Sequence, residues 1–287
     1  SKDGYIMNEQ RVVNAKVVGN KGNIWNKILL AIVLVCVGAA GMYAVMKLNP
    51  GTTVVNKLEK EVTVNENGIA DAVEKVYNSV VVVENYRSNK LQATGTGFIF
   101  KKDGNKYYVM TNYHVIENSS KVKIVLTDDT NTEVEVVGGD KYADIAVLSF
   151  TSSSDLTVAE IGSSTDGRVG DTTFAVGAPL DSSTYSWTVT RGILSGKDRM
   201  VAVSTTNSTS SDYIMRVLQT DAAINSGNSG GPLCNSNGQV IGVTNMKLVS
   251  SGVEGMGFAI PIEDAMDFAN KIINGDDITR PRLGISM

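Results

Sequence analysis

Short runs of β-branched and aromatic residues, separated by turn-forming residues, recur through the middle of this chain. Five of them lie at 80–83, 98–100, 107–110, 122–126 and 134–137. Runs of this length and composition predict short β-strands. A chain of 287 residues with 28 glycines and 5 prolines can hold one sizeable all-β domain with short appendages. The sequence therefore predicts an all-β fold.

Two helices are predicted at the edges of this β-rich region, because apolar residues recur there at helical spacing. The first precedes the first strand and uses Ile69, Ala72, Val73 and Val76. The second lies between Pro261 and Asn274-Gly275, which are typical start and stop signals. Its apolar positions are Ile262, Ala265, Met266, Ala269 and Ile272. Both helices are predicted to be structural.

An uncharged apolar segment occupies residues 28–46, between Lys27 and Lys47. At about 1.5 Å of rise per residue, a helix of this length nearly matches a hydrocarbon core of about 30 Å. The alternative is a cleaved signal peptide, because the small residues at 38–41 offer a cleavage site. The apolar run continues through Met46, which favours a single transmembrane helix.

The basic residues around this segment predict its orientation. Arg11, Lys16, Lys21 and Lys27 precede it, and Lys47, Lys57 and Lys60 follow it. The slight excess before the helix favours a cytoplasmic N-terminus. The domain that follows would then lie outside the cytoplasmic membrane.

The single histidine of the chain, His114, and a glycine-flanked serine, Ser229, suggest nucleophilic catalysis. A serine hydroxyl at its free pKa does not attack at neutral pH without an adjacent base, and here the base can only be His114. Asp144 opens an apolar strand-like run between the two and is placed to orient the imidazole. The order His, Asp, Ser is that of chymotrypsin-like enzymes.

The glycines beside Ser229 add a second chemical element. A tight backbone bend lets the N–H groups of Gly227, Asn228 and Ser229 converge on the oxygen of a tetrahedral intermediate. One such donor is worth about 2.7–4 kcal/mol of barrier. A side chain at Gly227 or Gly230 would obstruct this approach. The sequence therefore predicts a backbone oxyanion hole next to the triad.

The segment QTDAAINSGNSGGPL at 219–233 closely resembles the nucleophile segment of the HtrA/Deg family of trypsin-like serine proteases. Segments similar to the same family occur in family order at 95–99 (GTGFI), 189–195 (VTRGILS) and 255–261 (GMGFAIP). The resemblance covers residues 69–287. One departure is Ser226, where many relatives carry proline. It changes the stiffness of the loop and leaves the chemistry in place.

The resemblance implies two packed six-stranded antiparallel β-barrels, with His114 and Asp144 on the first and Ser229 on the second. It also implies a homotrimer, no cofactor, and a bacterial protease tethered outside the cytoplasmic membrane. The expected organisation is a cytoplasmic tail at 1–27, a transmembrane helix at 28–46, a linker at 47–67 and the protease domain at 68–275. Residues 276–287 would begin a linker toward a PDZ domain that this chain lacks.

The residue six before the nucleophile lies at the floor of the primary specificity pocket in trypsin-like folds. Here it is Ala223, so no carboxylate is present for a substrate Lys or Arg. By resemblance, Ile224 and Leu248 would line the pocket. An apolar lining favours a small or medium aliphatic side chain before the cut, although one methylene changes selectivity by only about 1–3 kcal/mol.

The run at 243–246 (Val243, Thr244, Asn245 and Met246) resembles the strand edge that pairs with an extended substrate backbone. Such β-augmentation accepts many side-chain sequences. Unfolded polypeptides fit that description best.

Composition argues against other ligands. Cys36 lies in the apolar segment and Cys234 follows the serine loop, so no intrachain disulfide is expected. One histidine and two distant cysteines argue against a zinc site, which needs three or four clustered ligands. A net charge of −4 and a pI near 5.2 give no indication of nucleic-acid binding.

The leading hypothesis is a membrane-anchored, ATP-independent serine endopeptidase that degrades misfolded or damaged extracytoplasmic proteins. Two alternatives stay open. One is a catalytically silent binding or holdase module that keeps the protease fold, suggested by loop-like segments at 166–168, 181–183 and 205–211. The other is a processing protease with one dedicated substrate.

Overall fold

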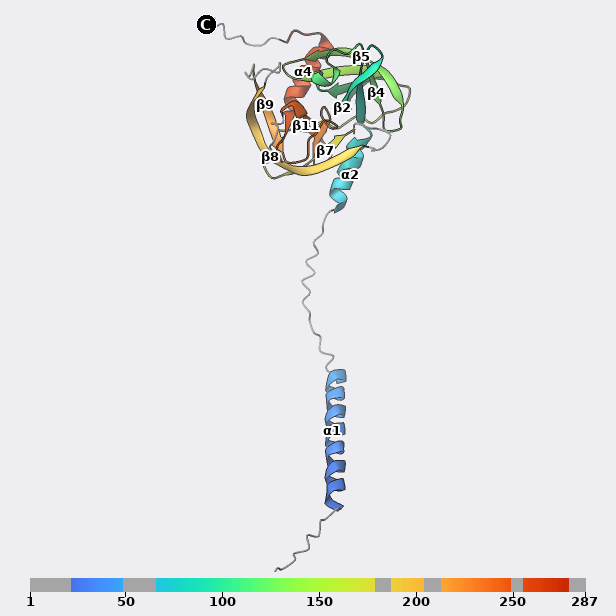
Figure 1. Cartoon of the computed structure of the whole chain (residues 1–287), viewed down its shortest axis with the longest axis vertical. Coiled ribbons are helices and arrows are strands. Elements are labelled where there is room, and N and C mark those ends of the chain that lie inside the picture. Colours follow the sequence, from blue (N-terminus) through green and yellow to red (C-terminus); the bar gives the residue numbers. More distant parts are fainter. Residues whose placement is uncertain (1–21, 49–65, 179–186, 204–212, 249–254, 279–287) are drawn as a thin grey trace, which may run out of the picture. The chain divides into compact units, whose positions relative to one another are not determined.

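The structure, a computed structural model, describes residues 22–48, 66–178, 187–203, 213–248 and 255–278. The chain separates into two compact units, Ser1–Val62 and Thr63–Met287. Most of the predicted tail at 1–27 and linker at 47–67 lies outside the described residues, as do the loops at 181–183 and 205–211 and most of 276–287. Figure 1 shows the helix of the first unit and the β-rich body of the second.

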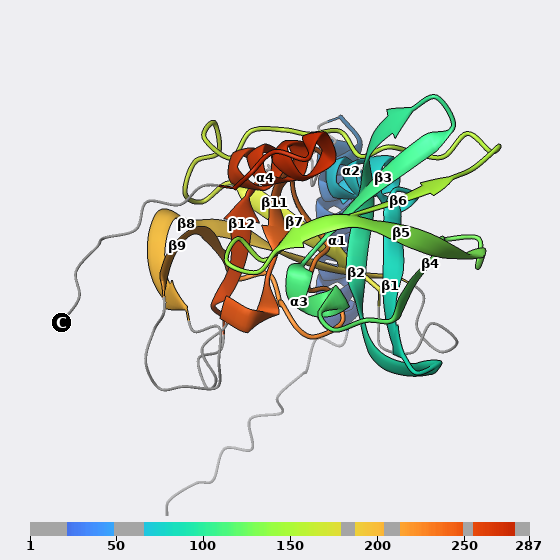
Figure 2. The same ribbon diagram turned by 90° about the horizontal axis from the view of Figure 1, so that it is seen from above.

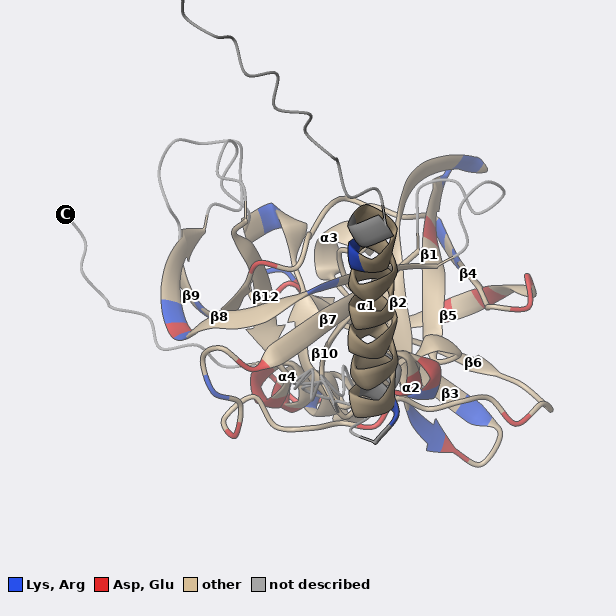
Figure 3. Cartoon of the chain, turned by 90° about the horizontal axis from the view of Figure 1, so that it is seen from below, with Lys and Arg blue, Asp and Glu red and all other residues tan. Residues whose placement is uncertain are grey.

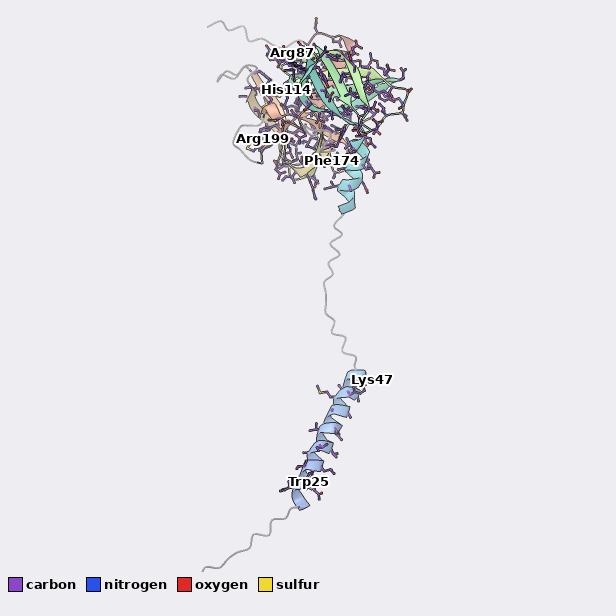
Figure 4. The ribbon with its side chains drawn as sticks, turned by 45° about the vertical axis from the view of Figure 1, so that its right-hand side comes forward. Trp25, Lys47, Arg87, His114, Phe174 and Arg199 are labelled. Atoms are coloured by element: carbon purple, nitrogen blue, oxygen red, sulfur yellow. The ribbon has the colours of Figure 1, made fainter. Side chains whose placement is uncertain are left out.

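The first unit contains α1 (Gly22–Leu48), which includes the predicted apolar segment. Its stretch Ile24–Val45 is long and apolar enough to cross a membrane by length and composition, and none of it is buried against protein. Figure 4 labels Trp25 and Lys47 near its two ends, and Figure 3 shows no acidic residue along it. Because its apolar side chains have no protein partner here, a lipid environment or a further protein surface would have to cover them.

The first barrel closes in the order β1-β2-β3-β6-β5-β4, with all neighbours antiparallel. Its strands are β1 (Val80–Arg87), β2 (Lys90–Asp103), β3 (Lys106–Thr111), β4 (Lys121–Val125), β5 (Asn131–Asp140) and β6 (Ile145–Thr151). All five strand-like runs identified in the sequence fall on these strands, except that Leu126 lies one residue beyond β4.

The second barrel closes in the order β10-β11-β12-β9-β8-β7. Its strands are β7 (Thr172–Gly177), β8 (Thr188–Val203), β9 (Tyr213–Thr220), β10 (Pro232–Asn235), β11 (Val240–Thr244) and β12 (Gly257–Pro261). The prediction of two six-stranded antiparallel barrels with short flanking helices is confirmed.

Strand β3 is apolar at successive positions because both of its faces are buried. Along β3, Tyr107 and Val109 face the interior of the first barrel. The alternate residues Tyr108 and Met110 belong instead to a core shared with second-barrel residues such as Phe174. This shared core packs the barrels against each other and sets the position of the cleft between them.

Helices α2 (Glu66–Tyr77) and α4 (Ile262–Asn274) match the two predicted helices. A short helix, α3 (Tyr113–Ile116), follows β3, and a 3₁₀ turn, η1 (Met246–Leu248), follows β11. Helix α4 contacts β5 and β6 of the first barrel and β11 and β12 of the second, and Figure 2 shows it lying across this region. It ends at Gly275, whose left-handed backbone (φ 71°) caps it.

Candidate active site

The three predicted catalytic residues come from three different connections. His114 lies in α3, directly after β3, and Asp144 immediately precedes β6. Because β3 and β6 are antiparallel neighbours in which Thr111 pairs with Ala146, the two residues meet at the same end of the barrel. Ser229 lies in the turn before β10 of the second barrel.

The fold places the three side chains next to one another, within proton-transfer distance. His114 Nδ1 is 2.7 Å from Asp144 Oδ2, and His114 Nε2 is 3.3 Å from Ser229 Oγ. Asp144 is 4% exposed and Ser229 3%, whereas the His114 side chain is 24% exposed. The imidazole therefore bridges a buried carboxylate and a buried hydroxyl while one side remains open to the cleft.

Asp144 is held by more than the imidazole. Its Oδ1 accepts the His114 backbone N–H at 2.9 Å, and its Oδ2 accepts the Asn245 amide at 2.8 Å. The Asp144 backbone is left-handed (φ 51°), a conformation that costs free energy in a non-glycine residue and is concentrated at functional sites. These bonds fix the carboxylate against His114 Nδ1.

The loop that carries Ser229 is tied to β2 of the other barrel. Thr96 N–H donates to the Ser229 carbonyl at 2.9 Å, and the Thr96 hydroxyl donates to the Gly227 carbonyl at 2.6 Å. At Gly230 the backbone is left-handed (φ 87°), and an added Cβ would lie 2.3 Å from the Thr96 carbonyl oxygen. A glycine is required at 230 for both reasons, and this explains one glycine of the GNSGG motif.

Two of the three predicted oxyanion donors, the N–H groups of Gly227 and Asn228, donate within their own loop in this conformation. Gly227 N–H donates to Asn225 Oδ1 at 3.0 Å, and Asn228 N–H donates to the Asn225 carbonyl at 3.2 Å. The Asn228 side chain closes the same turn by donating to the Ala223 carbonyl at 2.8 Å. Asn225, which the sequence analysis did not single out, therefore organises this loop.

The residues predicted to bind substrate do not line one shared pocket. Val243 and Thr244 are fully buried in β11, whose backbone pairs with β10 and β12 on its two sides. The chain then turns at η1, so the expected free strand edge is absent from this conformation. Asn245 supports Asp144 instead, as described above.

The remaining predicted pocket residues are dispersed. Leu248 is buried in the core between the barrels, and Ile224 packs in the second barrel beside Leu194 and Leu218. Ala223 is exposed, and its carbonyl accepts the Asn228 amide and the Thr190 hydroxyl. The sequence of the run at 243–246 could not show whether this strand has a free edge or is already paired on both sides, as the structure has it.

A cavity of about 420 Å³ opens directly beside the candidate nucleophile. Its lining comes from β2, from the region of α3 and from both sides of the cleft: Ala93, Thr94, His114, Val115, Glu117, Ser226, Ser229, Met246 and Lys247. Most of these residues lie outside the segments that the sequence analysis assigned to substrate.

Among the described residues no group of three or more His, Cys, Asp and Glu side chains is placed to hold a metal ion. Cys234 is fully buried in β10, and burial raises the pKa of its thiol well above the usual range. That thiol is neutral at physiological pH, so it is not a nucleophile.

Comparison with known proteins agrees with this architecture. The family described as "Trypsin-like peptidase domain" matches residues 95–243, more than half of the chain. The crystal structure of the serine endoprotease from Yersinia pestis superposes with a TM-score of 0.60 at 32% identity, covering 72% of this chain and 66% of that one. The two-barrel fold and the matched segment define a trypsin-like peptidase.

Two relatives show to which family of trypsin-like peptidases the chain belongs. "Serine protease Do-like HtrA" of Bacillus subtilis (strain 168) is 45% identical over 194 residues, covering 68% of this chain and 42% of that protein. The protein of the same name from Lactococcus lactis subsp. cremoris (strain MG1363) is 36% identical over 93% of this chain and 74% of its own length. The chain belongs to the HtrA/Deg family of trypsin-like serine proteases. It spans 42% of that Bacillus subtilis protein and 51% of a second one from the same strain, "Serine protease Do-like HtrB".

Proposed function

We propose that this chain is a serine endopeptidase whose nucleophile, base and orienting acid are Ser229, His114 and Asp144. The observation that carries the proposal is the position of His114, with Nδ1 at 2.7 Å from Asp144 and Nε2 at 3.3 Å from Ser229 Oγ. This is the geometry a proton relay requires, because one ring nitrogen donates to the carboxylate while the other faces the hydroxyl.

In the proposed reaction, Ser229 Oγ bonds to the carbonyl carbon of the substrate peptide while its proton passes to His114 Nε2. The tetrahedral intermediate collapses when the protonated imidazole gives that proton to the leaving amine. Water then attacks the acyl-enzyme by the same relay and restores Ser229. Asp144 keeps the imidazole in the required tautomer and stabilises its positive charge throughout.

The oxyanion of the intermediate would be held by backbone N–H groups of the segment Gly227, Asn228 and Ser229. Because Gly227 N–H now donates to Asn225 Oδ1 at 3.0 Å, substrate binding would have to turn this peptide outward. One such donor is worth about 2.7–4 kcal/mol of barrier, so the loop rearrangement would separate an inactive from an active enzyme.

The proposed substrates are unfolded polypeptides with an aliphatic residue before the cleaved bond. Ala223 in place of an acidic residue supports this preference, as does the exposure of apolar Met246 beside Ser229. Ile224, Leu248, Val243, Thr244 and Asn245 would contribute to substrate binding only after η1 and the adjoining loop rearrange. Peptide libraries varied at the position before the cut test the preference: aliphatic residues should give the highest kcat/KM.

The proposed location is the outer face of the cytoplasmic membrane, with α1 as the anchor and the unit that begins at Thr63 outside. The apolar stretch Ile24–Val45 supports it, and a relative from Rickettsia conorii is named a probable periplasmic endoprotease. Alkaline extraction of membranes should leave the full chain in the pellet. Recovery of a soluble form cleaved within residues 38–46 would show a signal peptide instead.

A homotrimer of protease domains, taken as residues 68–275, is proposed from the family resemblance. Sedimentation equilibrium of that domain should give three times its monomer mass. A monomer at all concentrations would contradict the trimer and leave the chemistry untouched.

The decisive experiment is labelling by a fluorophosphonate probe combined with casein digestion. Wild-type protein should become labelled on Ser229 and should cut casein at many sites, and Ser229→Ala should lose both activities. Casein turnover that survives Ser229→Ala would refute the triad. Absence of labelling, together with suppression of casein aggregation, would establish a holdase. Cleavage at a single site in one protein only would establish a dedicated processing protease.

A further inference from the structure

Two polar atoms lie closer to the Ser229 hydroxyl oxygen than the imidazole of His114 does. Its Oγ is 2.9 Å from Asn112 Oδ1 and 3.1 Å from the Met246 backbone nitrogen, whereas His114 Nε2 is 3.3 Å away. A hydroxyl has one hydrogen to donate and two lone pairs to accept with. It therefore cannot donate to Asn112 and to His114 at the same time.

The orientation of the Asn112 amide decides between these two acceptors. Its Nδ2 is 3.1 Å from the Asp144 carbonyl oxygen, which can only accept a hydrogen bond. Nδ2 must therefore face Asp144, and Oδ1 must face Ser229. Two oxygens 2.9 Å apart require a hydrogen between them, and only the Ser229 hydroxyl can supply it. The Ser229 hydroxyl therefore donates its hydrogen bond to Asn112 Oδ1 and not to His114 Nε2.

A second bond restrains the same oxygen. Met246 N–H points at Ser229 Oγ and uses one of its lone pairs. The turn that presents this N–H is held by Asn245, whose Oδ1 accepts the Lys247 N–H at 3.0 Å. Asn112 is fully buried and Ser229 is only 3% exposed, so the bond between their side chains is largely shielded from water.

We propose that Asn112 is a positioning residue that holds the Ser229 hydroxyl out of the proton relay until substrate is bound. This rests on the proposed function of Ser229 as the nucleophile. Attack requires the hydroxyl hydrogen to rotate from Asn112 Oδ1 to His114 Nε2 before Oγ bonds to the carbonyl carbon and the proton passes to the ring. The bond from Met246 N–H restrains the same oxygen, and a substrate strand that unfolds η1 would release it.

The test compares two asparagines of equal burial. Asn112 and Asn245 are both fully buried beside the triad, but only Asn112 accepts the Ser229 hydroxyl. Asn112→Ala should raise the rate of fluorophosphonate labelling, measured without peptide, by roughly three- to tenfold, the equivalent of one ordinary hydrogen bond. Asn245→Ala should lower it, because the bond of its amide to the charged Asp144 carboxylate is worth more than the neutral bond from Lys247 N–H to its Oδ1, which holds the η1 turn. A folded Asn112→Ala protein that labels no faster than wild type would overturn the proposal.

NMR of the imidazole tests the same proposal without an activity measurement and without the Asn112→Ala variant. His114 is the only histidine, so ¹⁵N-histidine labelling gives the resonances of one imidazole. If the hydroxyl donates to Asn112, Ser229→Ala should leave the Nε2 resonance nearly unchanged. A large change on that substitution would show that the hydroxyl donates to His114 and would overturn the proposal. If the wild-type protein never reacts with the probe, the proposed enzyme function fails while this comparison still reports on the hydroxyl.

Discussion

The Asn245 side-chain amide donates to Asp144 Oδ2 at 2.8 Å, and the same oxygen lies 2.7 Å from His114 Nδ1. Asp144 and Asn245 are 101 positions apart in the sequence and lie in different barrels. The second barrel therefore supplies a support for the acid of the first.

Removal of the Asn245 amide should lower kcat/KM, because this amide holds the Asp144 carboxylate. Asn245→Ala leaves the Asp144 carboxylate with one donor fewer, and a bond to a charged group is worth about 1.5–3 kcal/mol. We expect kcat/KM to fall at least about tenfold, because 1.4 kcal/mol corresponds to a factor of ten. The control is Asn235→Ala in β10, whose amide donates to Gln239 away from the site. It should change the melting temperature and leave kcat/KM within about twofold of wild type.

Gly230→Ala should abolish activity by displacing the nucleophile loop. The new Cβ would lie 2.3 Å from the Thr96 carbonyl oxygen, in addition to the strain of a left-handed alanine. The matched control is Gly104→Ala, where φ is also positive (60°) but no atom lies within 4 Å of the added Cβ. That variant should lose on the order of 1–2 kcal/mol of unfolding free energy and keep its activity. Equal activities for the two variants would contradict the steric argument.

Thr96→Val should weaken the connection between β2 and the serine loop. The hydroxyl donates to the Gly227 carbonyl at 2.6 Å and accepts the Ala178 N–H at 2.9 Å, and the isosteric valine loses both bonds. Two buried groups left unsatisfied should cost at least about 2 kcal/mol of unfolding free energy. Urea denaturation in a Ser229→Ala background, which prevents self-digestion, measures this loss. Thr188→Val, at an exposed position in β8, should be close to neutral.

Glu263 at the start of α4 should make stability depend on pH. Burial raises the pKa of its carboxyl, but hydrogen bonds from the hydroxyl and backbone N–H of Ser164 lower it by more, so the pKa lies below its ordinary value of 4.5. A carboxyl with a lowered folded pKa stabilises the fold fully above its unfolded pKa and loses that contribution as pH falls through the folded value.

Glu263→Gln should therefore lower the melting temperature at pH 7, because the variant loses on the order of 1 kcal/mol of unfolding free energy. The difference from wild type should shrink as pH falls below the ordinary glutamate pKa of 4.5. Melting curves from pH 3 to pH 7 in the Ser229→Ala background provide the measurement. A difference that stays constant across this range would show that the Glu263 charge contributes nothing.

The sequence predicts elements whose signals are local. The helices at 66–77 and 262–274 follow from apolar spacing and end signals, and the strands follow from short β-branched runs. The order of three motifs predicts a triad of His114, Asp144 and Ser229, and the fold brings these side chains together; their catalytic roles stay a prediction.

The roles of Asn112 and Met246 could not be read in this way, because they depend on contacts made only after folding. Asn112 faces Ser229 because the Asp144 carbonyl fixes its amide, and no spacing in the sequence encodes that constraint. The turn at η1 likewise depends on Asn245, which is bonded to Asp144. A strand edge predicted at 243–246 was therefore replaced by a paired strand and a tight turn.

Helix α4 lies against strands of both barrels, with Ile262, Ala265 and Ala269 fully buried in their common core. It therefore connects the two barrels by packing against both of them. A hinge motion that spread the barrels apart would expose those three side chains to water, so the halves should melt as one cooperative unit. Access to Ser229 is then governed by the short segments at the rim, and a chain cut before residue 262 should lose cooperativity in unfolding before it loses its strands.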